Sequence, residues 1–580
     1  MKNRILCLLL VFALMLGICG MLASCGGDNG GEEVIPVNPE DLPEADRNTS
    51  KYYEYTWSTK TLNVELSEHS CSNELLPRVR RYLAGMDTSA ADQIDEDIRY
   101  RNANADKVAR TKINWTYLQD VDDYAWGQNV SRIANESQNY SDKSADIYIN
   151  FIYDIVSAQL QGAFANLRST TMPGAKGKNY FEFTASDYNP AVDDEGYMYD
   201  LMNSLSFSTK KMYVLASDYF TDIVRAFFVV PVNVEMINGI DVTMVEKYNY
   251  DGNDKFDIED FFQIIDKNEW NYDAVKVLSA AVAAEGDDPE SLLDDTHGFV
   301  LGGMDSGIHG VGILYGSDVT VIQRTLDEAT GFYQVSYPAD AGSTPGTYGA
   351  FCDSLASLFT SPGVSVFPKD KVNFDPNNRS GDKIRDLFCK NQVLFGGNIC
   401  VGNLELGEYQ QMNAEGAGFG VAPVPMYRVY DPSIDIDANG VNRYYRTASH
   451  NIGKAAGISV STNKFKECSA WLDYQSTHST DILNDYYKTK LQYGIVGGGS
   501  SGGHNVDILE MLRNNVSTAL DKCYDDAITN YFKAQASRWC TMINNKGYQF
   551  TDVRTQYTAA VKLKEGYLAE IQSKYDQLPE

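Results

Sequence analysis

One short motif near the C-terminus has the residue types of a serine nucleophile. Gly498-Gly499-Ser500-Ser501-Gly502 fits the Gly-x-Ser-x-Gly pattern, in which the serine stands on a sharp turn between a strand and a helix. Catalysis on that pattern requires an acid and then a histidine later in the chain. The only later histidine is His504, which would point into the helix that follows the same turn. We therefore interpret residues 497–503 as a Gly/Ser loop.

Other catalytic or metal chemistry has little support. The chain has 79 Asp and Glu residues, so a glycosidase pair of carboxylates cannot be singled out from sequence. The six histidines are scattered without the spacing of metal ligands. Asp251-Gly252-Asn253-Asp254 begins like a calcium loop, but Phe256 occupies the position where such a loop needs glycine. We expect no enzymatic activity, no metal and no cofactor.

The composition disfavours acidic partners and suits a hydroxyl-rich ligand. A formal charge of -30 over 580 residues repels phosphate backbones, so we expect no nucleic-acid partner. The 38 tyrosines offer an apolar face with a polar tip, which suits the binding of hydroxyl-rich ligands, although most of them must be half-buried structural residues.

The N-terminus has the pattern of an export signal. Lys2 and Arg4 precede an apolar run from Ile5 to about Met21, and Leu22-Ala23-Ser24-Cys25 follows. This end resembles the lipobox of bacterial lipoproteins; an ordinary signal peptide with an incidental cysteine is the alternative. The resemblance implies that residues 1–24 are removed and that Cys25 carries a lipid. Residues 25–50 are rich in Gly, Asp, Glu and Pro and would form a flexible tether on the outer face of the bacterial cell membrane.

The spacing of the remaining cysteines does not support a disulfide framework. Of ten cysteines, Cys7 and Cys19 would leave with the signal. The others are widely spaced without a Cys-x-x-Cys motif, which favours free thiols, although one or two disulfides stay open. Beyond Cys25 they are Cys71, Cys352, Cys389, Cys400, Cys468, Cys523 and Cys540.

Strands and helices alternate in the first third of the body. The pattern predicts strands at 61–66, 112–118 and 145–151 with helices between them, which indicates an α/β lobe with a largely parallel sheet. Ligands bind outside the carboxyl ends of such strands. Residues 226–233 form a buried apolar strand, and we interpret the Gly-rich stretch 302–316 as packing and turns. Further helices are predicted at 258–265, from 272, and at 348–359, 383–390, 465–475, 506–523 and 557–575.

Several segments in order resemble one family. They are the lipobox, the acidic tether, the α/β lobe, the apolar strand ending in Pro231-Val232-Asn233, the helix start Trp270-Asn271-Tyr272-Asp273, and the motifs at 395–398 and 418–425. Over residues 51–480 the chain is similar to the extracellular (family 1) solute-binding proteins of ABC transporters, the maltose-binding-protein type. The resemblance implies a type II periplasmic-binding-protein-like α/β fold, with two lobes joined by crossover strands and with extra C-terminal helices. It divides the chain into lobe 1 (51–225 and 392–445), lobe 2 (226–391 and 446–504) and C-terminal helices (505–580), with an insert at 169–209.

The resemblance also implies a ligand site between the lobes. The loop after the third strand is the strongest candidate, and residues of the second lobe and of the crossovers would complete the site. The expected ligand-binding residues are Asn150, Phe151, Tyr153, Asp154, Asp305, Ser306, Asn398 and Tyr427. For each of them, a turn or hinge role is the alternative, and for His450 in the last crossover we favour that alternative.

The functional expectation follows from this likeness. We expect a monomeric, membrane-anchored protein that closes its lobes on a solute and presents it to the permease subunits of an ABC importer. A carbohydrate or oligosaccharide is the first expectation for that solute. The alternatives are a secreted lipoprotein glycoside hydrolase and another surface glycan-binding lipoprotein. A peptide or another polar solute also stays open as the ligand.

Overall fold

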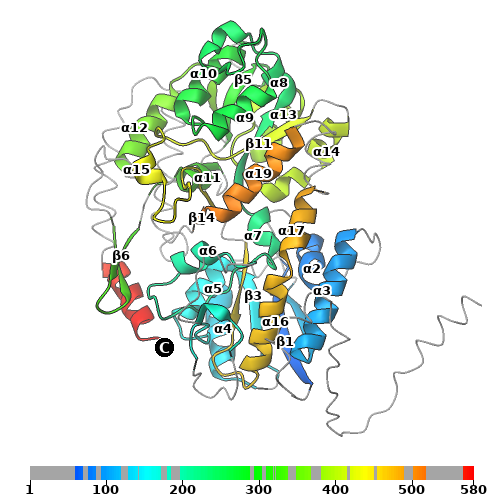
Figure 1. The fold of residues 1–580 in the computed structure, drawn as a ribbon, viewed down its shortest axis with the longest axis vertical. Helices are drawn as coiled ribbons and strands as arrows, with labels where there is room; N and C mark the ends of the chain where they lie inside the picture. Colours follow the sequence, from blue (N-terminus) through cyan, green and yellow to red (C-terminus); the bar gives the residue numbers. More distant parts are fainter. Residues whose placement is uncertain are drawn as a thin grey trace, which may run out of the picture.

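Two separate sheets organise the chain (Figure 1). The computed structural model describes residues 59–68, 76–85, 93–118, 128–141, 143–170, 179–184, 196–287, 293–302, 309–317, 319, 322–337, 348–367, 380–405, 407–414, 418–449, 453–488, 501–517 and 566–579. Within these ranges no helix combines the length and the apolarity that crossing a membrane requires. The four cysteines among them are free: Cys352, Cys389, Cys400 and Cys468.

The first sheet has four strands in the order β13-β3-β1-β2. Strand β1 (Lys60–Ser67) pairs in parallel with β2 (Thr111–Leu118) and β3 (Ile147–Phe151), whereas β13 (Lys454–Ile458) runs antiparallel to β3. The predicted, largely parallel sheet is therefore confirmed. With its helices it forms lobe 1: α2 (Leu76–Ala84), α3 (Gln93–Ala109), α4 (Gln128–Gln138), α5 (Ile152–Gln159), α6 (Tyr199–Ser204), α16 (Phe465–Thr477) and α17 (Thr480–Tyr486).

The second sheet belongs to lobe 2 and is mixed. Strand β5 (His297–Gly302) pairs in parallel with β8 (Val364–Phe367) and β9 (Val393–Phe395). Strand β4 (Phe228–Asn233) runs antiparallel to β9, to β10 (Ile399–Cys400) and to β11 (Phe419–Ala422). Its helices are α8 (Val234–Asn238), α9 (Ile258–Asp266), α10 (Tyr272–Val282), α11 (His309–Gly316), α12 (Tyr348–Phe359), α13 (Ser380–Cys389), α14 (Gly407–Ala414), α15 (Pro432–Asp435) and α19 (Ser501–Asn514).

Among the described elements, the chain crosses between the lobes at three neighbouring places. The chain passes from α7 (Thr221–Arg225) into β4, from β12 (Thr447–Ala448) into β13, and from α17 to α19. The first two crossings lie side by side, because Phe227 forms an antiparallel bridge with Ser449, and β12 also pairs with β14 (Val516–Ser517). We call this region, made of α7, the start of β4, β12, β14 and the start of β13, the waist.

The sequence-based division into lobes was wrong in three places. Residues 392–445 contain β9, β10 and β11, which all pair with β4 in lobe 2, and residues 446–504 contain β13, α16 and α17 of lobe 1. The part of 505–580 that belongs to α19 is not a separate helical unit, since α19 packs on β11 and α9. Helix α19 also ends at Asn514, before the predicted end at 523, and of the predicted helix 557–575 the described part is the helix at 566–576.

Two glycine-containing motifs have structural roles that were not expected. The stretch 395–398 is a one-residue bulge between β9 and β10, where Gly397 has φ +71°, and not a return to lobe 1. Half of the Gly-rich stretch 302–316 is helix α11. In contrast, the start of α10 is as predicted, because the Asn271 side chain accepts hydrogen bonds from the backbone amides of Asp273 and Ala274.

A partly buried carboxyl in lobe 1 makes stability depend on pH. Asp106 on α3 accepts a hydrogen bond from Trp471 Nε1 at 2.9 Å, but burial raises the pKa of Asp106 to about 6. The unfolded chain loses this proton near pH 4, so stability falls as the pH rises from about 4 to 6. Asp106→Asn keeps the Trp471 bond and should raise the free energy of unfolding at pH 7.5 by about 1 kcal/mol, but not at pH 4. Thermal melts at both pH values test this, with the exposed Glu96→Gln as control; equal gains at both pH values would contradict it.

Candidate functional site

The carboxyl ends of the parallel strands in both lobes point to the waist. In lobe 1 the last residue of β3, Phe151, pairs with Lys454, the first residue of β13 after the crossing. In lobe 2, β9 and β10 follow one another along β4, and Cys400, the last residue of β10, pairs with Phe228, the first residue of β4. Because β5 runs parallel to β9, its carboxyl end points the same way. Ligands of open α/β sheets bind at carboxyl ends of strands. The candidate site is therefore the region where the two lobes face each other beside the waist.

The predicted loop of lobe 1 lies at that position. Asn150 and Phe151 end β3, and Tyr153 and Asp154 lie in the first turn of α5. Asn150 and Asp154 are buried, and Tyr153 is partly exposed. The Asn150 Oδ1 accepts a hydrogen bond from the backbone amide of Phe151 at 2.7 Å. The structure thus brings these four residues together, while their contact with a ligand stays a prediction.

The amide group of Asn150 is a donor without a protein acceptor. Its Nδ2 is buried and has no hydrogen-bond partner among the described residues. A buried donor of this kind costs free energy unless something satisfies it. The ring of the next residue, Phe151, has the Lys454 ammonium 4.1 Å from its centre. Amide donors and aromatic rings are two kinds of group that recognise hydroxyl-rich ligands.

A buried ionic network continues from Lys454 into the waist. The Arg225 side chain is fully buried and donates to Asp222 at 2.8 Å and to Glu405 at 2.9 Å. Lys454 Nζ lies 4.0 Å from the Asp222 carboxylate, and Tyr486 donates to Glu405 at 2.7 Å. Burial lowers the pKa of Arg225, but Glu405 and Asp222 raise it more, so the pKa lies well above its ordinary value. Because Glu405 closes a short helix after β10, the network joins elements of both lobes.

Sequence reasoning missed this network, although one signal was present. Arg225 directly precedes the apolar run of β4, and a charge at the edge of a buried strand requires a partner. The distant partner Glu405 and the second cation of the network, Lys454, lie about two hundred residues further along the chain, so no local pattern could identify them.

The predicted residues of lobe 2 separate into two places. Asn398 is fully buried in the bulge, where its Cβ lies 3.0 Å from the position that a Cβ on Gly312 would occupy. Tyr427 instead lines a cavity of about 290 Å³ at the start of α10 and beside α12, with its ring packed edge-on against Phe351. The cavity is near the lower size limit of ligand pockets. It is lined by Asn271, Tyr272, Asp273, Lys276, Asp353, Ser354, Ser357, Tyr427, Arg428 and Val429.

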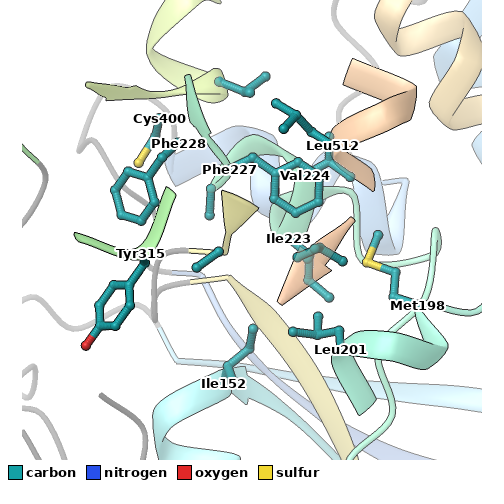
Figure 2. Close-up of a cluster of buried hydrophobic side chains, with 14 of the residues drawn as sticks. Ile152, Met198, Leu201, Ile223, Val224, Phe227, Phe228, Tyr315, Cys400 and Leu512 are labelled. Atoms are coloured by element: carbon teal, nitrogen blue, oxygen red, sulfur yellow. The ribbon is translucent and has the colours of Figure 1, made fainter. Parts of the chain in front are cut away.

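The waist itself is filled by apolar side chains from both lobes (Figure 2). Ile152 and Leu201 of lobe 1, Phe228 and Tyr315 of lobe 2, and residues of α7 between them are buried. This packing joins the two lobes at the waist. Asp305, Ser306, His450 and Cys25 lie outside the described residues, so their predicted roles stay predictions. The described residues hold no group of three or more side chains fit to bind a metal, and the Asp251 carboxylate accepts from the Asn253 amide within its own turn.

Comparison with solved structures finds sugar-binding proteins of ABC transporters. The GacH receptor of Streptomyces glaucescens, solved with acarbose, is 12% identical, with a TM-score of 0.43 over 88% of this chain and 99% of that one. The galacto-N-biose/lacto-N-biose I-binding protein of Bifidobacterium longum is 10% identical, with a TM-score of 0.44 over 88% and 98%. The N-glycan transport solute-binding protein of Streptococcus pneumoniae is 13% identical, with a TM-score of 0.39 over 90% and 99%. No family model and no curated protein matches the sequence.

Proposed function

We propose that this chain is an extracytoplasmic solute-binding protein that binds a carbohydrate between its two lobes and delivers it to an ABC importer. The observation that carries the proposal is the convergence of strand ends from two α/β sheets on one waist with three crossings. Such crossings act as hinges, and closure around a ligand is the movement that they permit. A lipid on Cys25 would hold the protein at the membrane surface, and no catalytic step is part of the proposal.

The carbohydrate preference is supported by the chemistry at the end of β3. The unsatisfied amide of Asn150 offers a donor to a hydroxyl, and Phe151 offers a ring. A thermal-shift screen of residues 51–580 against sugars, peptides and polyols tests the ligand class. At 100 times its dissociation constant, a ligand should add about 2.7 kcal/mol to the stability. A shift with peptides alone would reject the carbohydrate, and cleavage of a bound sugar would favour a hydrolase.

The Asn150 amide should contribute to affinity for the sugar that the screen identifies. We expect Asn150→Asp, which keeps the acceptor to the Phe151 amide and removes the donor, to weaken binding by about tenfold. Isothermal titration calorimetry measures the change, and Asn114→Ala, on an exposed position of β2, is the control. If the Asn150→Asp variant binds the sugar as tightly as the unchanged protein does, Asn150 is not part of the site.

A further inference from the structure

A hairpin that belongs to lobe 2 by sequence is docked on lobe 1. Strands β6 (Gln323–Asp327) and β7 (Phe332–Ser336) lie in the chain between α11 and α12, which both pack with elements of lobe 2. The hairpin nevertheless contacts residues 203–209 of lobe 1 and the helix at 566–576. Figure 1 shows the hairpin at the edge of the molecule, away from α7 of the waist and from α17. It therefore adds to the three crossings a further link between the lobes, and this link is made by docking.

Main-chain hydrogen bonds attach the hairpin to lobe 1. The amide of Thr209 donates to Gly331 O, and the amide of Tyr333 donates to Phe207 O, both at 2.9 Å. Ser208 and Phe332 form the antiparallel bridge between these two bonds. Lobe 1 thus extends the outer edge of β7 by one bridged residue with two main-chain hydrogen bonds. A two-stranded hairpin is only marginally stable in water, so this one depends on docking for its order.

Arg324 attaches β6, the other strand of the hairpin, to lobe 1. Its Nη1 donates to Asn203 O and to Ser206 O, both at 2.6 Å, and its guanidinium lies 4.6 Å from the centre of the Tyr333 ring. Asn203 and Ser206 flank the C-terminal end of α6, where backbone carbonyls lack partners within the helix. Charge-assisted bonds of this kind are stronger than neutral ones. One arginine of the hairpin therefore closes a helix end of the opposite lobe.

The C-terminal helix covers the docked hairpin. The Gln572 side chain donates to Tyr333 O at 2.7 Å and accepts from the Val335 amide at 3.2 Å. Tyr575, which is fully buried, donates to Lys211 O at 3.0 Å and lies 2.9 Å from the hydroxyl of Ser206. The helix consequently binds both the hairpin and the segment of lobe 1 that receives it.

We propose that the β6–β7 hairpin is a latch between the lobes. Docked, it holds the lobes at the separation seen here; undocked, it releases them to open about the waist. The bonds of Thr209, Tyr333 and Arg324 join the hairpin, which belongs to the chain of lobe 2, to lobe 1. Opening that carries the hairpin away with lobe 2 therefore has to break them. The proposal goes beyond the solute-binding function, because lobe opening can be measured without a ligand.

Loosening and locking the latch should have opposite effects. In Arg324→Ala we expect the amides of Thr209 and Tyr333 to exchange hydrogen at least about tenfold faster, and the radius of gyration from small-angle X-ray scattering to increase. Gln572→Ala should do the same to a smaller extent. A disulfide in Ser208→Cys/Phe332→Cys, a pair without mutual hydrogen bonds in the bridge and so close enough to join, should prevent the expansion when combined with Gln572→Ala.

The control is Thr325→Ala, an exposed neighbour of Arg324 on the opposite side of β6, which should leave both readouts unchanged. Circular dichroism establishes that each variant is folded. Unchanged exchange in Arg324→Ala would overturn the docking role. Faster exchange with an unchanged radius of gyration would show that the hairpin is a local part of lobe 1, and it would overturn the latch while leaving the solute-binding proposal in place.

Discussion

Replacing Arg225 by methionine should lower the free energy of unfolding by about 3 to 5 kcal/mol. The guanidinium is fully buried between Asp222 and Glu405, at 2.8 and 2.9 Å. Without it, two carboxylates stay buried with only Lys454 nearby among the described cations, 4.0 Å from one of them. An uncompensated buried charge is far more costly than the loss of a surface ion pair. Guanidinium-induced unfolding, followed by fluorescence, measures the change.

Two further variants separate the network from a general loss of charge. Lys574→Met removes one partner of an exposed pair with Glu570 and should change the free energy of unfolding by less than about 0.5 kcal/mol. The triple variant Arg225→Met, Asp222→Asn and Glu405→Gln removes the charge of Arg225 and those of its two carboxylate partners. It should therefore restore much of the lost stability. If the single variant Arg225→Met is as stable as Lys574→Met, the prediction is wrong. Water or a rearrangement would then satisfy the two buried carboxylates.

Strands could be predicted from the sequence because a buried strand is a local property. The apolar residues of β3 and β4 are contiguous, and the alternation in β1 is visible within eight residues. The end of β3 is also local, so Asn150 and Phe151 were expected at the edge of the sheet. Their cross-strand neighbours Ala455 and Lys454 lie about three hundred residues later and were not.

Sheet membership could not be predicted, because pairing decides it. Strands β9, β10 and β11 look from sequence like short apolar strands that could join either lobe. Their antiparallel pairing with β4, and the parallel pairing of β9 with β5, place them in lobe 2. The motif at 395–398 was placed in lobe 1 for the same reason. Two adjacent glycines suit a crossover as well as a bulge, and the register on β4 distinguishes the two.

The β6–β7 hairpin left a weak signal that was missed. Its strands consist of exposed and partly exposed residues, and the four-residue connection ends in Gly331, which has φ +74°. Since neither strand is apolar, the pattern of burial that identifies core strands is absent. The bonds that give this hairpin its place come from residues 203–209 and from Gln572, which no local pattern connects with it.

A second large effect is expected at Gly298, in β5. A Cβ at this position would lie 2.1 Å from the Cα of Ser279 and 2.2 Å from its Cβ, on the helix α10 that covers the strand. Backbone cannot yield as a flexible side chain does, so strand and helix would have to separate. We expect Gly298→Ala to lower the free energy of unfolding by about 3 kcal/mol or more. Thermal and denaturant unfolding of the purified variant measure it.

Gly503→Ala is the matched control, because the same methyl group meets nothing within 4 Å at this helical position. There alanine should stabilise the protein by up to about 1 kcal/mol, so the two glycine-to-alanine changes should have opposite signs. The contrast also bears on function. The carboxyl end of β5, at Gly302, points to the waist, and a displaced β5 would change the wall that lobe 2 presents to a ligand. If Gly298→Ala is as stable as Gly503→Ala, then α10 and β5 do not pack as closely as this fold requires, and the position of that wall has to be revised.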